Sequence, residues 1–178
     1  MNYYISDLHL FHNNILTLPN TNRPFASIEE MHEKIKHEWI KKVTYRDKVY
    51  ILGDVGMYHE TEIASFLKRL PGKKFLVMGN HDIFNVKNKE FCKVFAWIRP
   101  YAEVWDNGRK VILFHYPIQE WNGFYRNAYH IHGHVHAEAL EQLPGRYNAC
   151  CDVNDFTPQS LDELINKTIP SKIRLKEP

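Results

Sequence analysis

The stretch Phe75-Leu76-Val77-Met78-Gly79-Asn80-His81-Asp82 joins a short apolar run to a glycine and three polar residues. An apolar run of this length, with aromatic and branched side chains, is typical of a buried strand. Imidazole and carboxylate groups at the carboxyl end of a strand lie where α/β proteins bind their ligands. The stretch therefore predicts an α/β fold with a polar site at the ends of its strands.

Four other parts of the chain repeat this arrangement of an apolar run followed by polar residues. The polar blocks are Asp7-x-His9, Gly53-Asp54, the lone His115 and Gly133-His134-x-His136, and the runs before them cover residues 3–5, 49–52, 111–114 and 129–131. Five of the eleven histidines fall in the five blocks. Groups that bind metal ions thus recur at five predicted strand ends.

Helices are predicted between the strands of the first half. Ser27 and Glu30 form a capping box, and the apolar residues that follow recur every three or four positions, as on one helix face. They are Ile28, Met31, Ile35, Trp39 and Val43. A second helix is expected over residues 60–70, where Pro71-Gly72 ends it. Further helices are expected near residues 87–95 and 160–166, and a loop over residues 21–25.

The second half has a more antiparallel pattern. Asp106-Asn107-Gly108 between two strand-like runs predicts a hairpin of residues 102–105 and 110–114. Another strand leads to Gly133, and residues 146–153 are expected to form one more. The whole pattern predicts an α/β fold of two packed mixed β-sheets flanked by helices, in one domain of residues 1–178.

Composition limits the classes of protein to which this chain can belong. The formal net charge of +2 is too small to argue for nucleic acid or an anionic membrane as partner. The three cysteines, Cys92, Cys150 and Cys151, form no spaced framework, which favours a reducing compartment. No signal-peptide pattern is present, and no apolar stretch approaches the ~20 residues needed to span a bilayer. We therefore expect a cytoplasmic protein without a membrane partner.

Taken in order, the five blocks resemble the motifs of the calcineurin-like metallophosphoesterase superfamily over residues 7–136. Arg23-Pro24-Phe25, His115-Tyr116-Pro117 and Asp152-Val153-Asn154-Asp155 resemble a small stand-alone subgroup found in bacteria and phages. The resemblance implies a four-layer α/β/β/α metallophosphoesterase sandwich. It also implies a phosphoric ester hydrolase that depends on a dinuclear metal centre.

The resemblance further implies which residues bind the two divalent metal ions. Mn²⁺ is expected first, with Fe²⁺, Zn²⁺ or Ni²⁺ as alternatives. One ion would be bound by Asp7, His9, Asp54 and His136, and Asp54 would bridge to the other, which Asn80, His115 and His134 complete. Two divalent ions outweigh the charge of two carboxylates, so the site would attract an anion. A metal-bridging hydroxide would then attack a bound phosphate ester.

The remaining polar residues near the blocks have expected roles in catalysis or substrate binding. His81 is expected to be the general acid, with Asp82 orienting its imidazole, and stabilisation of phosphate charge is the milder alternative. His12, Arg23 and His132 are expected to contact substrate. Each also has a structural interpretation: His12 as a surface residue, Arg23 as a loop cap, and His132 as a packing residue like His130. The aromatic residues Trp121, Phe124 and Tyr125 either stack on a base or pack in the core.

Three functions remain open from the sequence. The first is hydrolysis of phosphate mono- or diesters of small molecules or nucleotides. The second is a nuclease acting on short single-stranded nucleic acid, since little net charge and no capping domain argue against duplex substrates. The third is a non-catalytic scaffold on the same fold, although such proteins lose ligands and this chain has them all. The site is expected to be open, with walls formed by loops near residues 12–23, 58 and 121–125.

Overall fold

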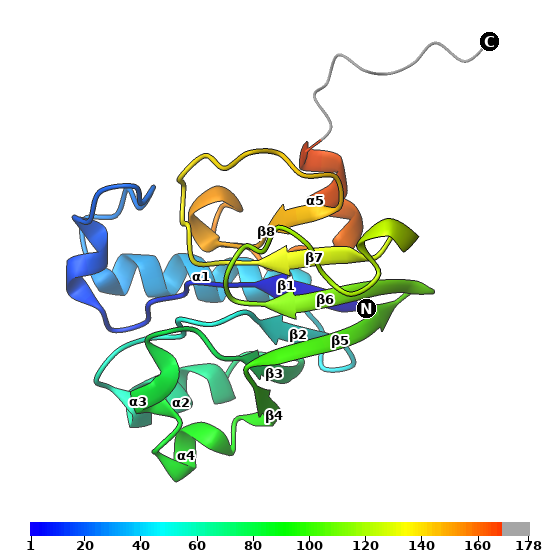
Figure 1. Ribbon diagram of the computed structural model, residues 1–178. Coiled ribbons are helices and arrows are strands. Elements are labelled where there is room, and N and C mark those ends of the chain that lie inside the picture. Colours follow the sequence, from blue (N-terminus) through cyan, green and yellow to red (C-terminus); the bar gives the residue numbers. More distant parts are fainter. Residues whose placement is uncertain (169–178) are drawn as a thin grey trace.

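Two four-stranded sheets pack face to face in the computed structural model, which describes residues 1–168 (Figure 1). The first sheet has the order β1-β2-β3-β4, and all of its pairs are parallel. Its strands are β1 (Asn2–Ile5), β2 (Lys48–Ile51), β3 (Lys73–Val77) and β4 (Phe95–Arg99). Because the strands run in the same direction, their carboxyl ends meet at one edge of the sheet.

The second sheet is mixed and has the order β5-β6-β7-β8. Its strands are β5 (Tyr101–Asp106), β6 (Arg109–Phe114), β7 (Tyr129–His132) and β8 (Arg146–Asn148). The β5–β6 pair is antiparallel, whereas β6–β7 and β7–β8 are parallel. The predicted hairpin is confirmed, with Asn107 and Gly108 at positive φ in a two-residue turn.

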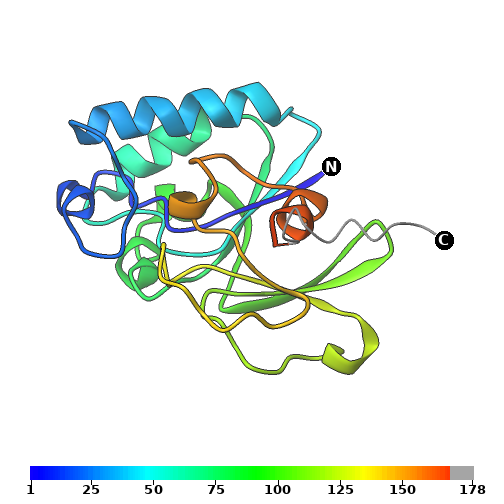
Figure 2. The same cartoon turned by 90° about the horizontal axis from the view of Figure 1, so that it is seen from above.

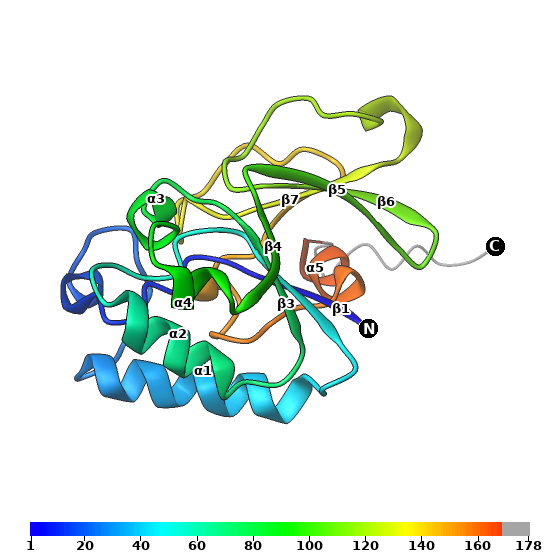
Figure 3. The same ribbon diagram turned by 90° about the horizontal axis from the view of Figure 1, so that it is seen from below.

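Alternation along the strands divides the apolar residues between two cores. Tyr3 and Ile5 of β1 face α1 (Ile28–Lys42) and α2 (Glu60–Lys68) on the outer face of the first sheet (Figure 3). Tyr4 faces the second sheet and stacks on Tyr50, with ring centroids 5.5 Å apart. The helix α5 (Leu161–Thr168) contributes Leu161 and Leu164 to the core between the sheets.

The outer face of the second sheet is covered by the segment 115–128 rather than by a long helix. Ile112 of β6 packs there against Trp121 and Ala128, and the segment contains the short 3-10 helix η2 (Phe124–Arg126). Figure 2 shows α1 along one side of the molecule and η2 on the opposite side. The layered sandwich of two sheets with flanking helices is thus confirmed, although the first sheet is parallel rather than mixed.

Two predicted elements differ from the structure. Residues 87–95 do not form one helix: α3 (Asp82–Asn85) and α4 (Lys89–Cys92) are single turns, and Phe95 begins β4. Residues 95–98 are apolar, and pairing with β3 stabilises them as a strand. The predicted strand 146–153 ends at Asn148, whose side-chain oxygen accepts a hydrogen bond from the Cys150 N–H (2.9 Å). Beyond it, the 3-10 helix η3 (Cys151–Val153) begins.

None of the helices within residues 1–168 is long and apolar enough to cross a membrane. The 3-10 helix η1 (Asn13–Leu16) and the loop after it connect β1 to α1.

Ser27 is the N-cap of α1 and accepts a hydrogen bond from the Glu30 N–H (3.2 Å), while the Glu30 carboxylate accepts from the Ala26 N–H (2.8 Å). In the simplest capping box, the carboxylate accepts from the N–H of the N-cap residue itself. Here it accepts from the N–H of Ala26, the residue before the N-cap.

We expect Ser27→Ala to lower the free energy of unfolding by about 1 kcal/mol, because the Glu30 N–H loses its acceptor. Ser27→Asp should keep the stability near that of the wild type, since aspartate is an equally good N-cap. Urea unfolding of the three proteins, fitted with a common slope, measures the difference. Equal stability of the alanine and aspartate variants would show that the cap contributes nothing.

Candidate metal centre

The loops that follow β1, β2, β3, β6 and β7 converge at the carboxyl ends of their strands (Figure 1). They bring the seven predicted metal-binding residues into one cluster. These residues are Asp7, His9, Asp54, Asn80, His115, His134 and His136. No two neighbouring loops supply the cluster alone, so it depends on the whole arrangement of strands.

Five residues of the cluster have a left-handed backbone. The φ angles lie between 46° and 74° for Asp7, His9, Asp54, His134 and His136. This region costs a non-glycine residue about 1–2 kcal/mol. Such strain persists only where the surrounding structure holds the residue, and it concentrates at functional sites. Here it turns side chains from separate loops toward a common centre.

Two glycines allow the loops to approach one another closely. A Cβ atom on Gly133 would lie 2.4 Å from Asp7 Oδ2, and one on Gly79 would lie 2.3 Å from Asp54 Oδ1. Neither carboxylate could keep its position beside a larger residue. The glycines before His134 and Asn80 therefore make the room that the two carboxylates occupy.

The Asp54 carboxylate lies at the middle of the cluster. Its Oδ2 is 3.5 Å from His115 Nε2 and 3.9 Å from the Nε2 atoms of both His9 and His81. Its Oδ1 accepts a hydrogen bond from the His81 N–H (3.0 Å). One carboxylate oxygen is thus surrounded by imidazoles from three loops, as expected of a group that binds metal on two sides.

The imidazoles are oriented so that one nitrogen contacts the protein and the other faces the cluster. His115 Nδ1 lies 2.7 Å from the Leu52 carbonyl oxygen, and His115 Nε2 lies 3.1 Å from Asn80 Oδ1. His9 Nδ1 lies 3.2 Å from His12 Nδ1, while His9 Nε2 is buried without any hydrogen-bond partner. A buried nitrogen of this kind needs an explanation, and a metal ion supplies one.

The second carboxylate, that of Asp7, connects the cluster to the loop after β7. Both oxygens of Asp7 accept hydrogen bonds from the His134 N–H, at 3.0 and 3.2 Å. The His134 ring packs against Tyr116, with centroids 4.6 Å apart, and against His115 at 5.1 Å. Tyr116 was given no role from the sequence, although it directly follows a predicted ligand.

The charges of the cluster favour a cation at its centre. Burial raises the pKa of Asp54, but His115 and the His81 N–H outweigh it and hold that pKa at about 2. Burial lowers the pKa of His115, but hydrogen bonding to Asp54 and the charges of Asp7 and Asp54 raise it to about 9. Burial lowers the pKa of His9 well below its usual range, which favours the neutral imidazole that can bind a metal ion. Burial raises the pKa of Asp7, so a divalent ion at the cluster would supply the positive charge that favours the ionised form of both carboxylates.

The donor set fits metal ions of the transition series. Potential ligand atoms of Asp7, His9 and His136 lie within 4.8 Å of one another, as do those of Asp7, Asp54 and His115. Carboxylate and imidazole donors, together with the amide of Asn80, suit Mn²⁺, Fe²⁺ and Zn²⁺. The residues present therefore fit two neighbouring divalent ions.

The two predicted catalytic residues have different surroundings. His81 is the N-cap of α3, and its side chain, 36% exposed, lies at the mouth of the cluster. Asp82 is fully buried, and its oxygens accept hydrogen bonds from the N–H groups of Asp54, Val55 and Gly79. The prediction that Asp82 orients the His81 ring is wrong, because its carboxylate instead joins the loops after β2 and β3.

Arg23 was predicted to contact substrate, and this prediction is wrong. Its side chain is fully buried, where it forms an ion pair with Asp152 and donates to the carbonyl oxygens of Asp7 and Leu8. No part of the guanidinium is free to reach a substrate phosphate. Asp152, which was given no role from the sequence, also lies 3.1 Å from His136 Nδ1. The only sequence signal for it was the subgroup motif that begins at this residue.

The other two predicted substrate contacts occupy different positions. His12 is half-buried beside His9 at the rim of the cluster. His132 is buried, and its Nδ1 lies 2.9 Å from the Gly133 carbonyl oxygen. It lines a cavity of about 320 Å³ that residues 137–143, β8 and α5 also line, and it belongs to none of the ligand groups. Since this cavity is lined by none of the seven predicted ligands, contact of His132 with substrate at the cluster is not supported.

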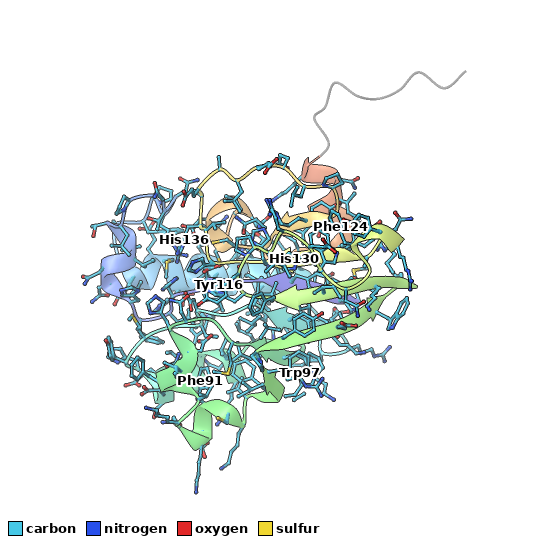
Figure 4. All side chains as sticks on the ribbon, viewed as in Figure 1. Phe91, Trp97, Tyr116, Phe124, His130 and His136 are labelled. Atoms are coloured by element: carbon cyan, nitrogen blue, oxygen red, sulfur yellow. The ribbon has the colours of Figure 1, made fainter. Side chains whose placement is uncertain are left out.

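The aromatic residues after His115 do not wall the cluster. Trp121 is buried and donates from Nε1 to the Ala128 carbonyl oxygen (2.9 Å), whereas Tyr125 is exposed. Figure 4 shows His136 and Phe124 toward opposite ends of the second sheet. The parallel β6–β7 pair explains this, because the connection must return to the start of β7 and carries residues 121–125 with it. The expectation that they border the site is wrong.

Comparisons with known proteins agree with this arrangement. Residues 3–142 match the family described as calcineurin-like phosphoesterase. The uncharacterized protein MJ1445 of Methanocaldococcus jannaschii is 30% identical over 179 residues, which cover 96% of this chain and 93% of that protein. The Gene 66 protein of Mycobacterium phage L5 is 29% identical over 98 residues, 52% of this chain and 44% of that protein.

One solved structure shares the fold over nearly the whole chain. The crystal structure of AQ665 from Aquifex aeolicus, a protein of unknown function, has a TM-score of 0.74 and 32% sequence identity. The similarity covers 95% of this chain and 99% of that one. Since the family match spans most of the chain, this protein belongs to the calcineurin-like phosphoesterase family.

Proposed function

We propose that this chain hydrolyses phosphate mono- or diesters of small molecules or nucleotides at a centre of two divalent metal ions. Its family implies metal-dependent hydrolysis of phosphoesters. The observation that carries the dinuclear proposal is the position of Asp54 Oδ2, which lies within 3.9 Å of imidazole nitrogens from three loops. A carboxylate in that position is suited to bridge two ions.

In this proposal, the ligands divide into two subsites around Asp54. Asp7, His9 and His136 would hold the first ion with Asp54, and Asn80, His115 and His134 would hold the second. The unpaired Nε2 of buried His9 supports the first subsite. The distances from His115 Nε2 to Asp54 Oδ2 (3.5 Å) and to Asn80 Oδ1 (3.1 Å) support the second. Mn²⁺ is the proposed ion, with Fe²⁺, Zn²⁺ and Ni²⁺ as alternatives.

When bound, two such ions would lower the pKa of a water molecule and offset the charge of a phosphate ester. The chain's own residues determine how much positive charge remains for substrate. Asp7 and Asp54 are the carboxylates of the proposed ligand set, and Asn80 would bind through an amide without cancelling charge. The resulting excess of positive charge favours an anionic substrate.

We propose His81 as the general acid. Its imidazole lies at the mouth of the cluster, 3.9 Å from Asp54 Oδ2. The backbone N–H of His81 donates to the Asp54 carboxylate. The backbone contact anchors the residue while the partly exposed ring remains free to meet a leaving oxygen. Protonating that oxygen matters most when it is basic.

The surroundings of the cluster support a small substrate. His12 and Tyr116 lie beside its ligands and are partly exposed. Phe124 lies toward the end of the second sheet opposite to His136 (Figure 4), and Trp121 packs against Ile112 on the outer face of that sheet. An open site of this kind suits aryl phosphates and nucleotides.

The three cysteines are all unpaired, which supports a reducing compartment such as the cytoplasm.

We expect the wild-type protein to retain close to two Mn²⁺ ions per chain after loading and desalting. Asp54→Asn should cause the largest loss of any single ligand change, because it weakens both subsites and removes negative charge between the cations. Elemental analysis measures the stoichiometry, and Asp106→Asn, which changes a buried carboxylate on the β5–β6 hairpin, is the control. A wild-type ratio near one with full activity would exclude the dinuclear proposal.

We expect His81→Asn to keep its metal content but to slow hydrolysis of alkyl phosphates by roughly 10²- to 10⁴-fold. Hydrolysis of para-nitrophenyl phosphate should slow much less, because nitrophenolate departs without protonation. Steady-state kinetics on both substrates provides the comparison within one enzyme. An equal loss on both would assign His81 to charge stabilisation and not to acid catalysis.

We expect the substrate to be small. With Mn²⁺ bound, the protein should hydrolyse para-nitrophenyl phosphate, its bis ester or nucleotides, and should cut duplex DNA weakly or not at all. A parallel assay should include 2′,3′-cyclic nucleotides and short single strands, with Asp54→Asn as the inactive control. Rapid cleavage of single strands would favour a nuclease, and processive degradation of duplex DNA would contradict the small-substrate proposal.

A further inference from the structure

A buried ion pair lies beneath one side of the metal centre. Arg23 Nη2 lies 2.7 Å from Asp152 Oδ2, and Arg23 Nε donates to Asp152 Oδ1 at 3.0 Å. Both side chains are fully buried. The pair joins the loop before α1 to η3, two segments separated by 129 positions in the chain. This bidentate geometry fixes the relative orientation of the two groups.

The pair contacts the residues that would bind the first metal ion. Asp152 Oδ2 lies 3.1 Å from His136 Nδ1, so the carboxylate can accept that N–H and leave Nε2 to face the cluster. Arg23 donates to the carbonyl oxygen of Asp7 (2.5 Å) and to that of Leu8 (3.2 Å). It therefore holds the backbone between Asp7 and His9.

The residues of the other subsite are held by different groups. His115 is oriented by the Leu52 carbonyl oxygen and Asn80. His134 is held through its N–H by the Asp7 carboxylate and through its ring by Tyr116. The two subsites thus have separate supports, apart from the carboxylates of Asp7 and Asp54.

The backbone of the proposed ligands of the first ion is strained, so it needs support from neighbouring groups. Asp7, His9 and His136 have φ angles of 55°, 46° and 48°, in the region that disfavours side chains. The Asn148 side chain also donates to the His136 carbonyl oxygen (2.9 Å), so His136 is held at both its backbone and its ring. A buried ion pair contributes little to stability compared with apolar packing, which favours a role in fixing geometry.

We propose that the Arg23–Asp152 ion pair is a positioning device for Asp7, His9 and His136, and that it sets the affinity of the first metal ion independently of the second. The inference rests on the proposed dinuclear centre. It also gives a physical role to the motif that begins at Asp152.

The alternative is that Asp152 is itself a ligand, together with His136 and Cys150. Potential ligand atoms of these three residues lie within 4.8 Å of one another. However, both Asp152 oxygens already accept from Arg23, and Oδ2 also accepts from Cys150 Sγ (2.9 Å). The geometry therefore favours Asp152 as a support, and metal stoichiometry distinguishes the two roles.

The test is titration of metal-free protein with Mn²⁺, followed by electron paramagnetic resonance and elemental analysis. Wild-type protein should bind two ions with a spin-coupled signal. Asp152→Asn should lower the affinity of one ion by roughly 10- to 100-fold and change that of the other much less. At intermediate Mn²⁺ concentrations, its spectrum should show isolated Mn²⁺. Asp106→Asn, the matched buried carboxylate, should bind both ions as the wild type does.

Because Asp152→Asn leaves Arg23 buried without a counter-charge, the double variant Arg23→Met/Asp152→Asn is the second test. It removes both charges together, and its thermal unfolding without metal reports folding separately from metal affinity. A folded variant that binds both ions with wild-type affinity overturns the inference, as does an equal loss at both sites. Failure of both variants to fold also overturns it, since the pair would then support the fold as a whole. A wild-type protein that binds more than two ions overturns it in favour of Asp152 as a ligand. One that binds fewer than two overturns the proposed function as well.

Discussion

The carboxylate of Asp82 joins the loops after β2 and β3, and the position of Asp54 depends on that connection. Asp82 accepts hydrogen bonds from three backbone N–H groups on the two loops and from the Asn85 side chain. Each N–H would otherwise be a buried donor without a partner, at a cost of about 1–3 kcal/mol. Burial raises the pKa of Asp82, and these hydrogen bonds favour its charged form in return. One buried carboxylate thus holds another at the centre of the cluster.

Backbone strain and close packing have a common cause in this site. Five side chains must point from three loops toward one small volume, and an ordinary backbone at those positions would direct them elsewhere. The left-handed conformations redirect the side chains, and Gly79 and Gly133 let the loops approach one another. Hydrogen bonds such as those from the His134 N–H to Asp7 offset the strain. A metal ion bound at the cluster would further stabilise this arrangement by its ligand bonds.

The topology of the second sheet explains why residues 121–125 lie away from the metal centre. Because β6 and β7 are parallel, the connection between them returns across the outer face and packs Trp121 against Ile112. Aromatic residues that could have enclosed a substrate serve instead as the outer cover of the sheet. The rim then depends on the loops after β1 and β6, which bear His12 and Tyr116.

Local sequence was sufficient to predict the features that depend on short-range chemistry. The apolar runs before each polar block predicted β1, β2, β3, β6 and β7, Ser27 predicted the start of α1, and Asn107-Gly108 predicted the hairpin. The blocks also predicted which side chains would gather, because parallel strands end at the same edge. The strand β4 was missed because its pairing with β3 decides the conformation of an ambiguous apolar segment.

Only the tertiary structure decided the roles of residues whose partners lie far away in the chain. From the sequence, Arg23 is expected to contact substrate and Asp82 to orient the His81 imidazole. In the structure, both are buried and contact other parts of the protein. The sequence names the charged residue but not its counter-charge, since Arg23 meets Asp152 only after the strands between them have paired. The five blocks therefore determined by themselves which side chains gather in the cluster. Packing over long sequence separations determined which charges face the site and which support it.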